Sequence, residues 1–271
     1  MPSSAEIVVE HILHRLEANR PLVTGICGAQ GSGKTWLTRA VAELLERRGF
    51  RCASLSLDDL YLSRAARAAV AGEVHPLFAV RGVPGTHDVA LGMRLLDAMQ
   101  LPGMVRLPMF DKASDDHLPP EQWCEVEAPF DVILFEGWCV GARPEQELAL
   151  VSPVNALEAE EDAVGRWRQH VNACLATPYQ YLFGRIDMLV LLQAPGFEVV
   201  ARWREQQEQT LRKSFDGTGT QAAALMDTAG IARFVMFYER LTRHILAEMP
   251  LRADLTITLD EYRTPIGVRT A

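Results

Sequence analysis

Apolar and polar residues alternate along the chain in blocks that predict strands separated by helices. Two short runs, 22–27 and 52–57, predict strands, and helix-forming residues fill positions 34–48 between them. Residues 4–19 place apolar side chains on one helical face, so we expect an N-terminal helix within residues 1–20. The chain therefore begins as helix–strand–loop–helix–strand, with a βαβ unit at its centre.

The same alternation continues to the end of the chain. Buried parallel strands are predicted by near-continuous apolar runs at residues 131–138 and 187–194. Two further strands are predicted at residues 104–110 and 255–260, the latter being the last strand. Helical patterns cover residues 88–99, 154–175, 197–213 and 220–248, and irregular loops are expected at residues 71–88 and 111–123. This order indicates an α/β fold with a mostly parallel sheet flanked by helices.

The composition is that of a globular domain, and it narrows the classes of partner. The chain has 271 residues, of which 48% are hydrophobic and 23% charged, so we expect one domain over residues 1–271. The formal net charge is −8, and the basic residues do not cluster, which argues against a nucleic-acid partner. A small anionic substrate is compatible with this charge, because a local basic pocket can lie inside an acidic protein.

Cysteine usage and hydropathy indicate the compartment. The five cysteines are odd in number, widely spaced and without a CxxC pair, which argues against a disulfide framework and a structural zinc site. The first residues lack the pattern of a signal peptide, and no stretch approaches about 18 apolar residues, so no membrane span is expected. We therefore expect a cytoplasmic protein, with an oligomeric state that the sequence leaves open.

The strongest chemical signal is a glycine-rich segment between the first strand and its helix. Its eight residues match GxxxxGK[ST]: Gly28, Ala29, Gln30, Gly31, Ser32, Gly33, Lys34 and Thr35. Glycines let backbone amides converge on phosphate oxygens, and the helix N-terminus favours an anion. Lys34 is expected to bridge the β- and γ-phosphates, and Thr35 to offer its hydroxyl to Mg²⁺. We therefore expect ATP and Mg²⁺ as ligands of a three-layer P-loop NTPase fold. No NKxD segment is present, which weakens a GTPase interpretation.

Acidic residues follow two predicted strands, at the edge where a parallel sheet places its ligand. One carboxylate of the pair Asp58 and Asp59 is expected to accept the proton of an attacking hydroxyl, and the other to cap a helix or contact the metal through water. Glu136 ends an apolar run where P-loop proteins place an acid that binds Mg²⁺ directly or through water. Alternatively, these acids are ordinary strand-end or capping residues.

Together these motifs resemble the D-glycerate 3-kinase family, which groups with uridine kinase, phosphoribulokinase and pantothenate kinase among P-loop kinases. The matching segments are SLDDLY at 56–61, RGVPGTHD at 81–88, LPMFDKASDDHLP at 107–119, VILFEGW at 132–138, VNALEAEEDAVGRWRQHVN at 154–172, ARWREQQE at 201–208 and TRHILAEMPLRADLTITLD at 242–260. The resemblance implies transfer of the ATP γ-phosphate to a hydroxyl of D-glycerate, giving 3-phosphoglycerate. It also implies that Asp58 rather than Asp59 is the catalytic base, assisted by Lys34 at the phosphates.

The loops that resemble this family supply candidate residues for an anionic acceptor: Arg81, His87, Asp88, Asp111 and Lys112. An arginine can hold a carboxylate through two parallel hydrogen bonds, and His87 and Asp88 can orient hydroxyl groups. The alternatives are that His87 and Asp88 cap the following helix and that Asp111 and Lys112 form a surface ion pair. Many family members have an arginine at the position of His117, which is expected to replace it with less charge.

A charged helix and the loop after it, at about residues 198–220, form a possible lid. The stretch carries Arg202, Arg204, Arg212 and Lys213. The resemblance implies that a lid brings arginines onto the transferring phosphate, where cations stabilise the transition state; Arg202 and Arg204 are the candidates, and the sequence leaves open which of them makes the contact. A solvated helix face is the alternative.

Two other functions also fit a P-loop: a kinase for a nucleoside, sugar phosphate or pantothenate, and a non-catalytic ATP-binding regulatory protein. The strand-end Asp58 and the segment RGVPGTHD favour a kinase, because a nucleotide switch needs neither.

Overall fold

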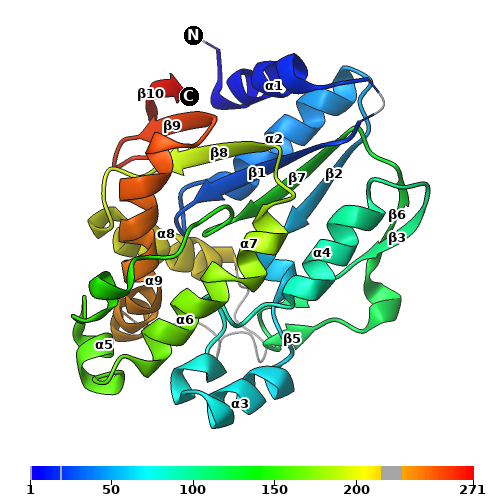
Figure 1. The fold of residues 1–271 in the computed structure, drawn as a ribbon. Helices are drawn as coiled ribbons and strands as arrows, with labels where there is room; N and C mark the ends of the chain where they lie inside the picture. The colour runs from blue at the N-terminus through cyan, green and yellow to red at the C-terminus, as the bar shows by residue number, and fades with distance from the viewer. Residues whose placement is uncertain (1, 19, 215–227) are drawn as a thin grey trace.

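The computed structural model describes residues 2–18, 20–214 and 228–271 and contains a six-stranded sheet of order β10-β9-β8-β1-β7-β2 (Figure 1). Its strands are β1 (Leu22–Gly28), β2 (Cys52–Ser56), β7 (Val132–Gly137), β8 (Met188–Gln193), β9 (Leu255–Leu259) and β10 (Pro265–Thr270). All neighbours pair in parallel except β10, which is antiparallel to β9. The mostly parallel sheet predicted from the sequence is thus confirmed.

Helices cover both faces of this sheet (Figure 1). They are α1 (Ser4–Arg15), α2 (Lys34–Arg47), α3 (Arg64–Glu73), α4 (Val89–Ala98), α5 (Ala156–Glu161), α6 (Arg166–Ala176), α7 (Pro178–Phe183), α8 (Glu198–Ser214) and α9 (Thr228–Glu248). Alternate side chains of β7 enter opposite cores: Ile133 and Phe135 pack with α4, α7 and α9, whereas Val132 and Leu134 pack with α1 and α2. This produces the three layers expected of the fold class.

Between α4 and β7 the chain makes an excursion of two small antiparallel sheets. β3 (Gly103–Leu107) pairs with β6 (Cys124–Ala128), and β4 (Phe110–Asp111) pairs with β5 (Asp116–His117). The Phe110 N–H donates to Asp59 Oδ1 at 3.2 Å, which joins the excursion to the short 3₁₀ helix η1 (Leu57–Leu60) after β2. The excursion is therefore anchored at the carboxyl edge of the large sheet.

Several boundaries differ from the sequence prediction. Residues 71–88 are not wholly irregular, because α3 ends within them and η2 (Pro76–Ala79) follows; Ser63 caps α3 by accepting the Ala66 N–H. The strand at 255–260 is not the last one, because β10 follows it as an exposed edge strand. Of the predicted helical residues 220–248, α9 covers those from Thr228 onward, and the others lie outside the described residues. No helix within the described ranges is long and apolar enough to cross a membrane.

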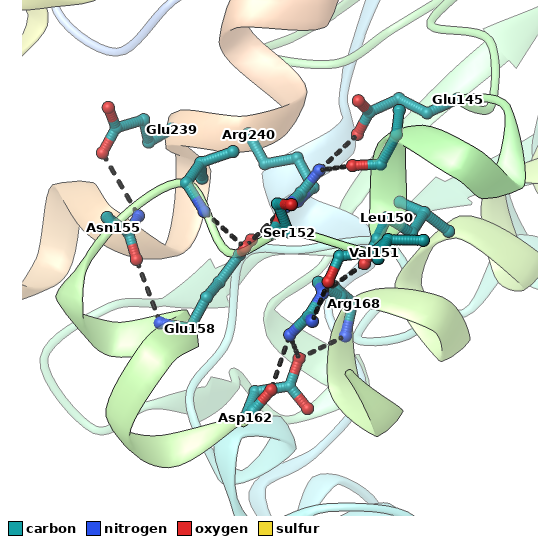
Figure 2. A network of polar contacts seen from close by, with 12 residues as sticks. Glu145, Leu150, Val151, Ser152, Asn155, Glu158, Asp162, Arg168, Glu239 and Arg240 are labelled. Atoms are coloured by element: carbon teal, nitrogen blue, oxygen red, sulfur yellow. Dashed lines mark hydrogen bonds and ion pairs between the residues drawn. The ribbon is translucent and has the colours of Figure 1, made fainter. Parts of the chain in front are cut away.

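A polar network joins α9 to α5 and α6, as Figure 2 shows. Arg168 donates to Asp162 Oδ2 at 2.9 Å, and both side chains are almost wholly buried. Arg240 of α9 pairs with Glu158 of α5 at 2.7 Å. Three charged residues of segment 154–172, namely Glu158, Asp162 and Arg168, therefore bind partners inside the fold and hold the helices together.

Candidate active site

The glycine-rich loop connects the end of β1 to the first turn of α2. Gly31 and Gly33 adopt left-handed conformations, with φ of 77° and 90°, which explains the need for glycine at these two positions. The Ser32 N–H donates to the Ala29 carbonyl at 3.1 Å and closes the turn. Since α2 begins at Lys34, its first N–H groups have no intrahelical acceptor and can bind an anion.

Three buried polar atoms around this loop have no hydrogen-bond partner among the described residues. They are Ser32 Oγ, Gln30 Oε1 and Glu136 Oε2. A buried polar atom without a hydrogen bond is costly, so these atoms suit a ligand that brings donors or positive charge. The Thr35 hydroxyl donates to the other oxygen of Glu136, Oε1, at 3.1 Å, which leaves the hydroxyl lone pairs available. This oxygen-rich pair fits Mg²⁺, which prefers carboxylate, hydroxyl and phosphate ligands.

A chain of hydrogen bonds connects the loop to the acids after β2. Glu136 Oε1 accepts the hydroxyls of Thr35 and Ser56, each at 3.1 Å. Ser56 Oγ in turn accepts the N–H of Asp58 at 3.2 Å. Because β7 lies between β1 and β2 in the sheet, the three predicted site residues Thr35, Glu136 and Asp58 meet at one edge.

The side chain of Asp58, the first acid of the pair, is 29% exposed. Its Oδ1 accepts the Tyr61 hydroxyl at 3.0 Å, and its Oδ2 accepts from Lys112 Nζ at 2.6 Å. Burial raises the pKa of the Asp58 carboxyl, but the charges of Lys112 and Lys34 and these hydrogen bonds outweigh burial and hold the pKa well below its usual range. Asp58 is therefore ionised and can accept a proton.

Asp59 has a different environment and a different contact. Its Oδ1 accepts the Phe110 N–H, and burial raises the pKa of its carboxyl. The side chain thus holds β4 in place. Asp58, in contrast, forms an ion pair with Lys112.

Arg81 is held by an ion-pair cluster that also contains Asp115 and Arg67. It pairs with Asp115, which also pairs with the fully buried Arg67 at 2.5 Å. The Arg81 guanidinium lies 5.5 Å from the ring centroid of Phe110, and its side chain remains 27% exposed. The sequence pattern did not identify Arg67 as part of the site, since an exposed-looking arginine in an alanine-rich helix gives no signal that it is buried.

His87 and Asp88 occupy the start of α4. His87 Nδ1 bonds the Tyr179 hydroxyl at 2.6 Å, and its ring stacks on Tyr61 with centroids 4.6 Å apart. Burial lowers the pKa of His87 to about 3, so the imidazole is neutral. Asp88 Oδ1 accepts the Leu91 N–H at 2.8 Å, which makes it the N-cap of α4. A role for either residue toward the acceptor stays a prediction.

The loop between β4 and β5 presents Lys112. Asp111 shapes this loop by accepting the N–H groups of Ala113 and Ser114, each at 3.0 Å. Lys112 is 60% exposed and reaches Asp58 rather than its neighbour Asp111. His117 Nε2 bonds the Tyr61 carbonyl at 2.6 Å, so the residue at the family's arginine position contacts the backbone beside the base.

The two predicted lid arginines lie on α8. Arg202 pairs with Glu261 at 2.7 Å, and the Arg204 guanidinium lies 5.3 Å from the ring centroid of Phe234. Residues 215–220 of the predicted lid lie outside the described residues. Contact of either arginine with a phosphate stays a prediction.

Comparison with known proteins places these features in context. No family model matches the chain. The uncharacterized kinase mug58 of Schizosaccharomyces pombe is 32% identical over 280 aligned positions, covering 97% of this chain and 99% of that protein. The chloroplastic D-glycerate 3-kinase of Arabidopsis thaliana is 30% identical over 91% of this chain, which spans 54% of that protein. Among solved structures, the D-glycerate 3-kinase of Cryptococcus neoformans var. grubii superposes with a TM-score of 0.78 at 24% identity, over 100% of both chains.

Proposed function

We propose that this chain transfers the γ-phosphoryl group of ATP to a hydroxyl of D-glycerate, because it belongs to the family of P-loop kinases related to D-glycerate 3-kinase. The product would be 3-phosphoglycerate. The glycine-rich loop and Lys34 would hold the phosphates, and Asp58 would accept the proton of the attacking hydroxyl.

The observation that carries this proposal is the hydrogen-bonded path from the phosphate loop to the base. Thr35 and Ser56 share one oxygen of Glu136, and Ser56 holds the backbone of Asp58. The path fixes the backbone of Asp58 relative to the loop, which supports transfer from a phosphate bound at the loop to an alcohol that Asp58 deprotonates. Thr35 and Glu136 would hold Mg²⁺, which supplies charge neutralisation at the phosphates when bound.

The surroundings of Asp58 support an anionic acceptor. Lys112 is exposed beside the carboxylate, and Arg81 lies in the same excursion with part of its guanidinium exposed. The Arg81 guanidinium donates to the Lys112 carbonyl at 3.4 Å, so the two cationic residues are neighbours. Two neighbouring cations suit a carboxylate, and an arginine held in place by Asp115 loses little entropy when it binds one. A nucleoside acceptor has no charge that these cations would pair with.

The test is product analysis with purified protein. We expect ATP, Mg²⁺ and D-glycerate to give ADP and a phosphoglycerate whose substituted hydroxyl is identified by mass spectrometry and NMR. Uridine, a sugar phosphate and pantothenate are the parallel acceptors. Turnover with one of these and none with D-glycerate would reject the proposed acceptor while preserving the kinase. The cytoplasmic location stays a prediction, and the Arabidopsis relative is named chloroplastic.

A further inference from the structure

The turn between β9 and β10 contacts the phosphate loop, although 232 positions separate Arg263 from Gly31 in the sequence. Nε of Arg263 donates to the Gly31 carbonyl oxygen at 2.5 Å. The same peptide unit is held on its other side, because the Ser32 N–H donates to the Ala29 carbonyl at 3.1 Å. Contacts on both sides therefore set the orientation of the Gly31–Ser32 peptide within the loop.

The turn itself is closely tied together. Asp260 Oδ1 accepts the N–H groups of Tyr262 and Thr264, each at 2.8 Å, and the Asp260 carbonyl accepts the Arg263 N–H at 3.1 Å. Arg263 adopts a left-handed conformation with φ of 69°, which is uncommon for a residue other than glycine. Such a conformation persists where the surroundings impose it, so the turn fixes the direction of the Arg263 side chain.

Trp203 of α8 completes the contact. The Arg263 guanidinium lies 5.2 Å from its ring centroid, in cation–π geometry. Trp203 is fully buried, and its indole N–H donates to the Glu261 carbonyl at 2.7 Å. A Cβ atom built on Gly31 would lie only 2.7 Å from Trp203 Cβ. The turn, the indole and the phosphate loop therefore pack as one unit.

The charge of Arg263 has no carboxylate partner within the described residues. Its contacts there are the carbonyl oxygens of Gly31 and Trp203 and the indole ring. Burial removes water from around the guanidinium and so lowers its pKa, but the group remains cationic. A partly desolvated cation is stabilised by a nearby anion, and the adjacent loop is the part of the fold suited to bind phosphate.

We propose that Arg263 is a positioning residue for nucleotide binding: it orients the Gly31 peptide of the phosphate loop and adds positive potential where the phosphates bind. This rests on the proposed use of ATP but not on the choice of acceptor. The effect is expected in the affinity for the phosphates and not in the affinity for the acceptor.

The test compares Arg263→Gln and Arg263→Lys with Arg269→Gln, an exposed arginine of the same hairpin whose guanidinium bonds the Pro250 carbonyl. Titration calorimetry measures the dissociation constants of ADP and of inorganic tripolyphosphate in the presence of Mg²⁺, and thermal unfolding is followed in parallel. We expect Arg263→Gln to raise the dissociation constants of both ligands about tenfold, the usual size of the effect when a hydrogen bond from a charged group is lost. Arg263→Lys should recover part of the loss because it retains the charge, and Arg269→Gln should match the wild type.

Two results would overturn the proposal. One is a lower unfolding temperature in Arg263→Gln with an unchanged ADP dissociation constant, which means a purely structural role. The other is an equal loss of ADP affinity in Arg263→Gln and Arg269→Gln. If Arg263→Gln does not fold, Arg263→Ala and Arg263→Lys take its place. Wild-type affinity for ADP in Arg263→Ala, together with weaker ADP binding in Arg263→Lys, would then reject the role of the charge. A wild type that binds ADP but does not phosphorylate D-glycerate rejects the acceptor alone and leaves this measurement valid.

Discussion

Lys112 Nζ lies 2.6 Å from Asp58 Oδ2, so the acid proposed as catalytic base is held in an ion pair before any acceptor is present. The ammonium group lowers the pKa of Asp58 and so makes its carboxylate a weaker base. An acceptor carboxylate that attracts Lys112 would release Asp58 and raise its basicity at the moment when a hydroxyl is available. The ion pair would in this way limit transfer of phosphate to water.

Asp58→Asn should retain ATP binding and reduce kcat by about two to four orders of magnitude, the range for loss of a general base. The asparagine keeps the size of the side chain and can still bond Tyr61, so the fold should be preserved. ADP release and nucleotide titration measure the two effects separately. Asp59→Asn is the matched control, because an amide oxygen can still accept the Phe110 N–H. Equal losses in the two variants would contradict the assignment of Asp58.

Lys112→Met should move the acidic limb of the kcat/KM profile to higher pH. Asp58 must be ionised to act, so activity disappears as the pH falls through its pKa, and removal of the ammonium group raises that pKa. The KM for D-glycerate should rise as well, since a cation is lost from the acceptor side. Lys112→Arg keeps the charge and should leave the limb near its wild-type position. An identical shift in both variants would rule out an electrostatic cause.

The strand order explains why the core of the site could be predicted. The GxxxxGK[ST] match identified Thr35, and the acids at the ends of two apolar runs identified Asp58 and Glu136. In a parallel sheet the carboxyl ends of neighbouring strands share one edge, so residues identified separately come together. The hydrogen bond of 3.1 Å between Thr35 and Glu136 joins two of them directly.

Contacts made by loops had no such signal. Lys112 contacts Asp58 across 54 positions of the sequence, and Arg263 contacts Gly31 across 232 positions. Both contacts depend on the conformation of turns, which the spacing of hydrophobic residues does not predict. The missed elements α3 and β10 have another cause. Arg67 is the one buried residue of α3, and every residue of β10 is exposed, so neither element carries an apolar stripe that a pattern could reveal.

Thr35→Ala and Glu136→Gln should each raise the Mg²⁺ concentration required for half-maximal activity by about tenfold, because each removes one oxygen ligand or its charge from the predicted metal site. The measurement is activity at fixed ATP over a range of Mg²⁺ concentrations. Thr35→Ser retains the hydroxyl and is the control, with an expected value close to that of the wild type. A requirement for Mg²⁺ that is unchanged in Thr35→Ala and Glu136→Gln would place the metal elsewhere.

Arg168→Met should destabilise the fold by about 3–5 kcal/mol, because it leaves the buried carboxylate of Asp162 without its partner. Arg233→Gln breaks an ion pair with Glu161 whose side chains are 47% and 40% exposed, and it should cost less than about 1 kcal/mol. Urea unfolding of both variants gives the comparison. Similar losses in the two variants would mean that the network in Figure 2 does not stabilise the helices as its burial indicates.

His87→Gln should make the stability of the protein less sensitive to acid. Burial lowers the pKa of His87 to about 3 in the folded chain, whereas a histidine in an unfolded chain titrates near about 6.5. Between these values the unfolded chain binds a proton that the folded chain does not, so acidification favours unfolding by up to about 1.4 kcal/mol per pH unit.

At pH 7 the variant should be about 1 kcal/mol less stable than the wild type, because the hydrogen bond of 2.6 Å between His87 and Tyr179 is altered. As the pH falls toward 4 this difference should shrink or change sign, since only the wild type must still keep a neutral imidazole buried. Urea unfolding at several pH values measures the difference, and His14→Gln serves as the control for removing an exposed imidazole. A difference between wild type and His87→Gln that stays constant from pH 7 to pH 4 would show that the buried imidazole does not oppose protonation.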